Sequence, residues 1–338
     1  MDHARAKPVP PSRVEHAARW LLRSLVCVLG LSAAWAQAQP YPSKPIRIVV
    51  PVATGGIADH YSRFIGTRLT EAWGQPVVVE NRAGGGGNIG ADLVAKAAPD
   101  GYTLVMGFVG PHAVNPFLFD RMPYDPVRDF VPVAMVVEAD GLLAVHPSLP
   151  VRTVAELIAL AKAQPGKLAY GSGGSGTTSH LAAELFKSMT QTYMVHIPYR
   201  GNSPAVMDLL AGQTQLAFAT LPTVIAHVRA GTLRGVAVIG TARSAAAPSL
   251  PTVAEGGVPG FAVNNWIGLF APAGTPPEIV RKLNAEVMRI MQLPEVKRRT
   301  ESEGERHTPN TPEQFAQFQR AEMAKWGKVI KDAGIKAD

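Results

Sequence analysis

Residues 46–59 read IRIVVPVATGGIAD, and they decide the fold. The run Ile46–Val52 is apolar apart from Arg47, as expected for a β-strand that is covered on both faces. A turn containing Thr54, Gly55 and Gly56 follows, and apolar residues then recur at helical spacing from Ile57 to Trp73. A strand, a glycine turn and a helix in this order predict the start of a βαβ unit with a parallel sheet.

Three further turns of this kind stand beside predicted strands and helices. They read AGGGGNIGA (residues 83–91), FVGPHAVN (residues 108–115) and GSGGSGTTSH (residues 171–180). Such turns present unpaired backbone N–H groups at the positive end of a helix dipole, where an anion binds without a charged side chain. Several of them in one chain predict a cleft that binds a small acid.

Strands and helices alternate along the chain in two blocks. Further strands are predicted at residues 77–80, 102–106, 131–138, 141–146, 168–171, 194–197, 215–219, 233–239 and 266–271. Capping boxes at Thr153–Glu156 and Thr275–Glu278 predict helix starts, and Thr311 opens a last amphipathic helix. We expect two hinged α/β lobes, each a mostly parallel sheet flanked by helices. Residues 41–140 with 240–338 would form the first lobe, and residues 141–239 the second.

The first 38 residues are predicted to be a secretory signal peptide. Basic side chains lead into the apolar run Leu25–Ala34, which is too short to span a membrane, and Ala36-Gln37-Ala38 is a cleavage signal. We expect cleavage after Ala38; an uncleaved anchor helix is the alternative. The single cysteine, Cys27, lies in this segment, so the rest of the chain has no disulfides, thiolate chemistry or cysteine-based zinc sites.

Charge and hydropathy limit the functional classes. The chain carries a net charge of +7, but residues 1–38 hold five basic and two acidic residues, so +4 remains beyond them. This weak, evenly spread excess suits an anionic ligand and argues against nucleic acid. No apolar run after residue 40 reaches the ~18 residues that a transmembrane helix needs.

Backbone N–H and hydroxyl groups of the turns are the predicted ligand contacts. The candidates in the first lobe are Thr54, Gly55, Gly56, Asp59, Val109, Gly110 and His112. Those in the second lobe are Ser172, Ser175, Thr177, Thr178, Ser179 and Asn202. One of the hydroxyls before Leu181 is also expected to cap its helix. Asp59 is negative, so it either orders its own loop or meets an amino or hydroxyl group of the ligand.

Other chemistries match the sequence less well. Gly85-x-Gly87-x-x-Gly90 has the dinucleotide spacing, but residues 105–113 contain no acid to bind a ribose. Gly173–Gly176 resembles part of a nucleophile elbow, yet Thr177 replaces its final glycine. The histidines are scattered without metal-ligand spacing. We expect no cofactor, no metal and no enzymatic activity; an exported hydrolase is the alternative.

These turns occur within longer motifs that resemble those of the solute-binding receptors of tripartite tricarboxylate transporters, the Bug family. The motifs are YPSKPIRIVVP (41–51), VVVENRAGGGGNIGA (77–91), AAPDGYTLVMG (97–107), MPYDPVRDFVPV (122–133), IPYRGNSPA (197–205), PTVAEGGVPG (251–260) and APAGTPPEIVRKLNAEV (271–287). The resemblance covers nearly the whole chain after the leader.

The resemblance implies a monomeric periplasmic receptor with a two-lobed, Venus-flytrap fold of the type II periplasmic binding proteins. Such a receptor closes on a small organic carboxylate and delivers it to a membrane permease with a large and a small subunit; a sensory receptor for a two-component system is the alternative. In the family, the turns at Thr54–Asp59 and Ser175–Ser179 contact the carboxylate, partly through ordered water.

Two departures from the family pattern bear on the ligand. Thr54 replaces a proline that many relatives have. Ala219 and Thr220 replace an acid and an amide, so an ammonium group would lack a partner. We therefore predict a di- or tricarboxylate or an aromatic acid, not an amino acid, and add Thr220 to the candidate contacts.

Overall fold

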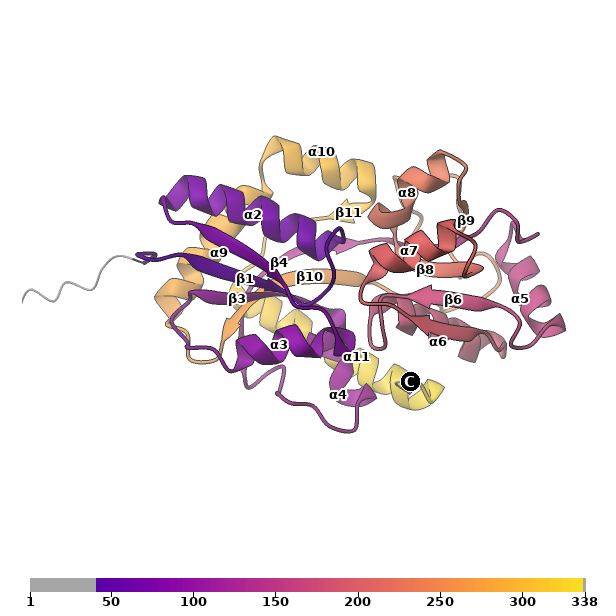
Figure 1. Ribbon diagram of the computed structural model, residues 1–338, viewed down its shortest axis with the longest axis horizontal. Helices are drawn as coiled ribbons and strands as arrows, with labels where there is room; N and C mark the ends of the chain where they lie inside the picture. Colours follow the sequence, from indigo (N-terminus) through magenta and orange to yellow (C-terminus); the bar gives the residue numbers. More distant parts are fainter. Residues whose placement is uncertain (1–40, 337–338) are drawn as a thin grey trace, which may run out of the picture. The chain divides into compact units, whose positions relative to one another are not determined.

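The first lobe is built on a six-stranded sheet in the order β11-β4-β10-β3-β1-β2 (Figure 1). Its strands are β1 (Ile46–Val50), β2 (Val77–Asn81), β3 (Thr103–Phe108), β4 (Phe130–Ala139), β10 (Asn265–Pro272) and β11 (Glu305–Arg306). The run Ile46–Val50 forms β1 between β3 and β2, and four of its five residues are fully buried. The apolar residues of this run are therefore covered as predicted, and Arg47 is its one partly exposed position.

Five α-helices of eight or more residues belong with this sheet. They are α2 (Ile57–Trp73), α3 (Asn88–Ala95), α9 (Pro277–Met291), α10 (Pro294–Glu303) and α11 (Pro312–Ala333). Helix α2 has the predicted bounds and buries Tyr61, Ile65 and Leu69. The helix α11 buries Phe315 and Trp326, as its amphipathic pattern predicts.

The second lobe has a five-stranded sheet in the order β7-β6-β8-β5-β9. Its strands are β5 (Gly141–Val145), β6 (Ala169–Ser172), β7 (Val195–Pro198), β8 (Leu216–Thr220) and β9 (Arg234–Val238). Its helices are α5 (Val154–Ala163), α6 (Thr178–Thr190), α7 (Asn202–Leu210) and α8 (Leu221–Arg229). Leu142, Leu209 and Val224 lie in a core cluster that joins this sheet to α7 and α8.

The expectation of mostly parallel sheets is corrected, because both sheets are mixed. Strand β1 runs parallel to β2 and β3, whereas β10 runs antiparallel to β3 and β4. In the second sheet β6 runs parallel to β7 and β8, and β5 runs antiparallel to β8 and β9. The antiparallel strands lie where the chain passes from one lobe to the other. Strand β4 leads into β5 of the second lobe, and β10 brings the chain back to the first sheet (Figure 1).

Helix starts agree with the sequence in part. The capping box Thr153–Glu156 is present, and Thr311 forms another with Gln314. The predicted box at Thr275 is wrong, because α9 begins at Pro277 and the hydroxyl of Thr275 donates to the Pro272 carbonyl. The stretch predicted as a turn at residues 108–115 instead continues from β3 into a π-helix, Gly110–Val114, and α4 (Asn115–Leu118).

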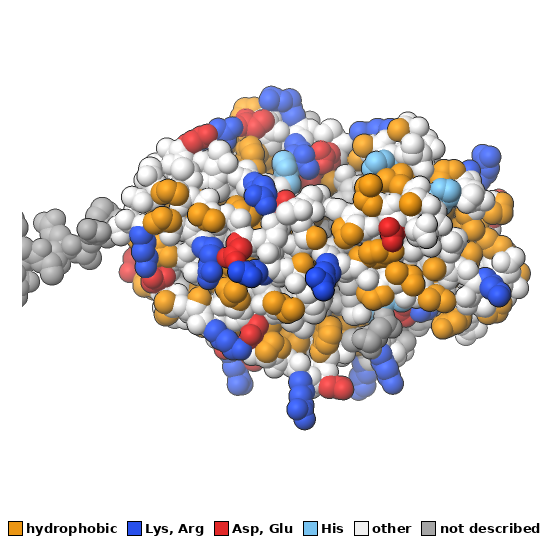
Figure 2. All heavy atoms as spheres, in the orientation of Figure 1, with side chains coloured by type: hydrophobic (Ala, Val, Ile, Leu, Met, Phe, Trp, Pro, Cys, Tyr) orange, Lys and Arg blue, Asp and Glu red, His pale blue; other side chains and the backbone are white. Residues whose placement is uncertain are grey.

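The computed structural model describes residues 41–336, so the predicted signal peptide and its cleavage site lie outside the described residues. Residues 44 onward form one compact unit, which contains both sheets. Among residues 41–336, no helix is long and apolar enough to cross a membrane. Acidic and basic side chains are interspersed over the face shown in Figure 2, without an extended patch of one sign.

Candidate ligand-binding site

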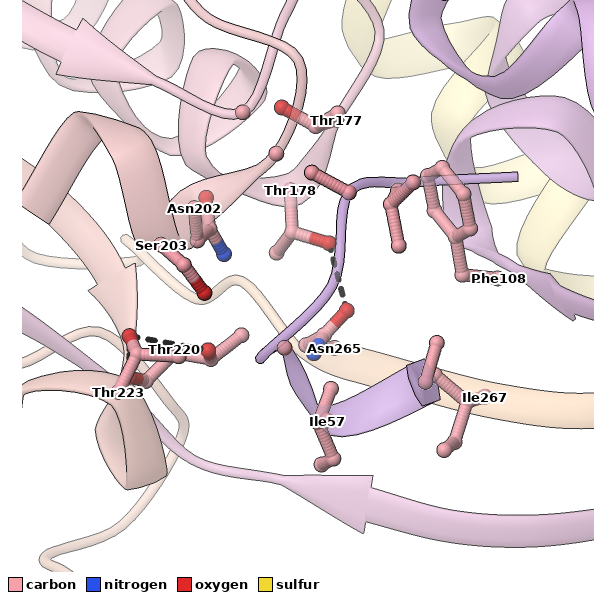
Figure 3. A pocket seen from close by; sticks show the side chains of 16 residues that line it. Ile57, Phe108, Thr177, Thr178, Asn202, Ser203, Thr220, Thr223, Asn265 and Ile267 are labelled. Carbon is pink, nitrogen blue, oxygen red and sulfur yellow. Dashed lines mark hydrogen bonds between the residues drawn. The ribbon is translucent and has the colours of Figure 1, made fainter. Parts of the chain in front are cut away.

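One pocket is lined by residues from both lobes (Figure 3). The empty space between its lining atoms is about 530 Å³, a volume that includes open solvent. The first lobe contributes Val52, Ala53, Gly56, Ile57, Ala58, Phe108, Asn265 and Ile267. The second lobe contributes Gly173, Thr177, Thr178, Gly201, Asn202, Ser203, Thr220 and Thr223. None of these sixteen described residues is charged.

Four helices begin at this pocket. Their N-cap residues are Gly56 of α2, Thr177 of α6, Gly201 of α7 and Thr220 of α8, and all four line it. Within the described chain, no N-cap side chain of these four accepts a hydrogen bond from its helix. Of the helices that begin elsewhere, α5 and α11 have complete capping boxes, whereas α3, α9 and α10 also lack a described side-chain cap. The first-turn N–H groups at the pocket are therefore left for an anion.

The expected side-chain cap on α6 is absent among the described residues, because the Thr177 hydroxyl donates to the Gly174 carbonyl instead. This hydrogen bond, 2.6 Å long, closes the turn before the helix. The hydroxyl therefore shapes the turn and leaves the helix N–H groups uncapped.

Asp59 sets the charge at the start of α2. One carboxylate oxygen accepts a hydrogen bond from the Gly55 N–H at 3.0 Å, and the other pairs with Arg63 at 2.9 Å. Burial raises the pKa of Asp59, but the hydrogen bonds from Arg63 and Gly55 outweigh burial and hold that pKa below its ordinary value. The ionised carboxylate orders the loop and offsets the positive end of α2.

Two hydroxyls at the start of α6 orient two amides in the pocket. Thr178 donates to Asn265 Oδ1 at 2.8 Å, and Ser179 donates to Asn202 Oδ1 at 2.9 Å. The first of these hydrogen bonds joins the two lobes (Figure 3). With both amide oxygens engaged, the amide NH₂ groups are the free donors, and that of Asn202 faces the pocket in Figure 3.

Five of the predicted contacts line the pocket: Gly56, Thr177, Thr178, Asn202 and Thr220. Other candidates lie beside it: Thr54, Gly55, Asp59, Val109, Gly110, His112, Ser172, Ser175 and Ser179 are not among its lining residues. The N–H of Gly55 is engaged by Asp59. Ser175 lines a neighbouring groove with Gly84–Gly87 and Arg200.

The turn Gly171–Ser179 is held together by its own side chains. The Gly174 N–H donates to the Ser172 hydroxyl, and the Gly173 N–H donates to the Ser179 hydroxyl. Ser172 also lies 2.5 Å from His196 Nε2. Ser172 and Ser179 therefore shape the turn from behind the pocket.

His112, Val109 and Gly110 are buried. The His112 ring stacks on Phe270 with 4.0 Å between ring centroids and meets Phe130 edge to face. Burial lowers the pKa of His112 to about 3, so the imidazole is neutral in the folded protein. Because this segment is helical, the side chain points into the core. Phe108 lines the pocket, whereas Phe218 and Trp266 are core residues.

Several lining residues were not predicted as contacts, among them Ile57, Thr223, Asn265 and Ile267. Asn265 stands at the start of β10, just before the apolar run from Trp266. A polar residue directly before a buried strand was the signal that could have identified it. Ile57 and Ile267 carried no such signal, because each reads as ordinary core.

A two-lobed α/β fold with an uncharged pocket between the lobes, surrounded by helix N-termini, is that of a solute-binding receptor. The family model "Tripartite tricarboxylate transporter family receptor" matches residues 62–335. BugT of Bordetella pertussis is 38% identical over 319 residues, covering 92% of this chain and 98% of BugT. The chain therefore belongs to the tripartite tricarboxylate transporter receptor family, as its motifs predicted.

Solved structures agree with this family and with the two-lobed fold. R. palustris Rpa4515 with adipate is 40% identical, with a TM-score of 0.84, and covers 87% of this chain and 99% of its own. MatC (Rpa3494) from Rhodopseudomonas palustris with bound malate is 33% identical, with a TM-score of 0.82, and covers 86% of this chain and 100% of its own. The family consists of periplasmic solute-binding receptors.

Proposed function

We propose that this protein captures a small organic carboxylate between its lobes and delivers it to a tripartite tricarboxylate-type permease. The supporting observation is the meeting of four helix N-termini, uncapped by described side chains, at one uncharged pocket. Each offers N–H groups at a positive dipole end, which favours an anionic ligand. The proposed contacts are Gly56, Thr177, Thr178, Asn202 and Thr220.

Lobe closure is the proposed mechanism, with lobes at residues 41–140 plus 240–338 and at residues 141–239. The Ala53 N–H donates to the Arg200 carbonyl at 2.9 Å, and Thr178 bonds Asn265, so the lobes already touch on two sides of the pocket. A ligand that contacts both lobes binds the closed form better and increases its population. Closure also removes water, which strengthens each N–H to carboxylate hydrogen bond.

The proposal also includes export to the periplasm by a cleavable signal peptide. The receptor would act there as a monomer and dock to a permease with a large and a small subunit. Binding without catalysis is favoured over the hydrolase alternative. Ser172 and His196 lie within hydrogen-bond distance, but Ser172 is fully buried and is not a lining residue of the pocket. A nucleophile must reach its substrate.

The lining favours carboxylic acids without an ammonium group over amino acids. Thr220 contributes a hydroxyl where an acid would pair with an ammonium group, and none of the described lining residues is acidic. A thermal-shift screen of the purified protein tests this, because a ligand that binds only the folded state raises the melting temperature. Di- or tricarboxylates or aromatic acids should raise it by several degrees, while aspartate and glutamate leave it unchanged. The opposite ranking, or no response to any acid, would overturn the proposal.

A further inference from the structure

The two walls of the pocket differ in chemistry. With the exception of Asn265, the side chains from the first lobe are apolar: Val52, Ala53, Ile57, Ala58, Phe108 and Ile267. Every side chain from the second lobe is polar: Thr177, Thr178, Asn202, Ser203, Thr220 and Thr223. In Figure 3, Phe108 and Ile267 lie on the opposite side from Asn202, Ser203 and Thr223. A ligand enclosed here meets hydrocarbon on one side and donors on the other.

The apolar wall is fixed by the first sheet. Phe108 of β3 and Ile267 of β10 are register partners, so their side chains are neighbours on one face. The Phe108 ring packs closely against two glycines. A Cβ at Gly87 would lie 2.8 Å from the ring, and one at Gly110 would lie 2.7 Å from it. The ring therefore has little room to withdraw from the pocket.

Charge favours the second lobe for the anionic end of the ligand. The described first turns of α6, α7 and α8 contain no acidic residue. Helix α2, by contrast, has the ionised Asp59 in its first turn. An anion is therefore attracted more strongly to the three helices of the second lobe than to α2.

Asn265 supplies an independent donor where the two walls meet. Only 6% of the residue is exposed, and its Oδ1 accepts the Thr178 hydroxyl. No described residue bonds its Nδ2, and Asn265 lines the pocket. This amide nitrogen can therefore donate to the ligand or to water.

We propose, resting on the function proposed above, that the pocket selects an acid with an unsubstituted hydrocarbon body. The carboxylate meets the N-termini of α6, α7 and α8 and the Asn265 amide, and the body packs on Ile57, Phe108 and Ile267. A hydroxyl group on the side of this body that faces the apolar wall is buried against hydrocarbon without a partner, which costs affinity. The apolar wall therefore determines specificity among carboxylates.

Calorimetric titration with matched pairs of acids tests the proposal. Adipate and galactarate have the same six carbons and two carboxylates, and galactarate adds four hydroxyls; succinate and tartrate form a shorter pair. In each pair that binds, the unsubstituted acid should bind about 100-fold more tightly. Equal or tighter binding of the hydroxylated acid overturns this inference and leaves carboxylate capture standing. No binding by any acid overturns both.

Substitutions in the pocket test where the hydrocarbon body of the bound acid lies. Ile57→Thr places a hydroxyl in the apolar wall, so the affinity ratio within each pair should fall by about 10-fold. Ile65→Thr is the matched control, because Ile65 lies on the same helix, is fully buried and is not a lining residue. Thr220→Val should weaken both members of a pair by similar factors. An unchanged ratio in Ile57→Thr contradicts the proposed placement.

Discussion

Asn265 is a pocket residue whose side chain joins the two lobes. Its Oδ1 accepts a hydrogen bond from Thr178 across the lobes, and a carboxylate at this position would accept the same bond. Asn265→Asp should therefore keep this contact while placing a negative charge against the bound acid. Like charges in a buried site cost several kcal/mol, so we expect adipate affinity to fall by at least ~100-fold in calorimetric titration.

Asn81→Asp provides the control for Asn265→Asp. Asn81 accepts a hydrogen bond from Arg63, donates one to the Val52 carbonyl and is not itself a lining residue, so the variant adds the same charge outside the site at the cost of that one donated bond. Its adipate affinity should stay within about threefold of wild type. Equal losses in the two variants would show that the effect is not local to Asn265.

Gly86, in the segment between β2 and α3, is another position at which the two lobes touch. Its φ is +62°, and a Cβ there would lie 2.1 Å from the Ser175 carbonyl oxygen of the other lobe. Gly86→Ala should therefore push the lobes apart and weaken adipate binding by more than about 10-fold, because the bound form requires closure. Calorimetry gives the affinity, and small-angle scattering with adipate present should give a larger radius of gyration than wild type.

Gly74 separates this effect from backbone strain. Its φ is +69°, and a Cβ added at Gly74 would have no described atom within 4 Å, so Gly74→Ala carries a similar conformational cost without a contact between lobes. Both variants should lose about 1 kcal/mol of stability, but only Gly86→Ala should lose affinity. Normal affinity in Gly86→Ala would mean that the Ser175 loop yields freely.

The regular elements were predictable because their signals are local. The apolar run at Ile46, the periodicity from Ile57 and the capping box at Thr153 each depend on a few neighbouring residues, and all three identify elements of the structure. The two-residue strand β11 was not predictable, because Glu305 is extended only through pairing with Ala139 of β4. The place of β10 between β3 and β4 likewise depends on contacts distant in sequence.

The sequence predicted that helix starts would form the pocket, but it did not predict which residues line it. Thr177, Thr178 and Asn202 line the pocket, as turns before helices predict. Ser175, two residues before Thr177, faces a neighbouring groove, and a one-dimensional pattern cannot distinguish the two directions. His112, another predicted contact, lies in a helical segment and is buried. Side-chain direction depends on the tertiary packing that the pattern omits.

At the scale of the whole molecule, a third contact joins the lobes beside the crossing at Asp140. The Asp140 N–H donates to the Gly304 carbonyl at 2.9 Å, and the Asp140 carbonyl accepts from the Leu221 N–H at 2.8 Å. Gly304 is followed directly by β11, which pairs with the last residues of β4. The end of α10 therefore contributes to the junction between the lobes, together with the strands that pass through it.

Glu305 of β11 makes the stability of this region depend on pH. Its side chain is fully buried beside the Tyr61 hydroxyl, which donates to it, with Arg299 3.9 Å away and Glu303 nearby. Burial raises the pKa of Glu305 to about 7 from an ordinary value of 4.5. Between these values the unfolded chain releases the proton and the folded protein keeps it, so the contribution of Glu305 to stability is lost as pH rises through 7.

Glu305→Gln should remove this dependence, because glutamine does not titrate. We expect the free energy of unfolding of wild type, measured relative to the variant by urea denaturation, to fall by roughly 2 kcal/mol between pH 5 and pH 8. Other titrating groups are common to both proteins and cancel in the difference. A constant difference across this range would show that Glu305 is already ionised at pH 5. A difference that grows with pH would mean that Arg299 stabilises the carboxylate more than burial penalises it.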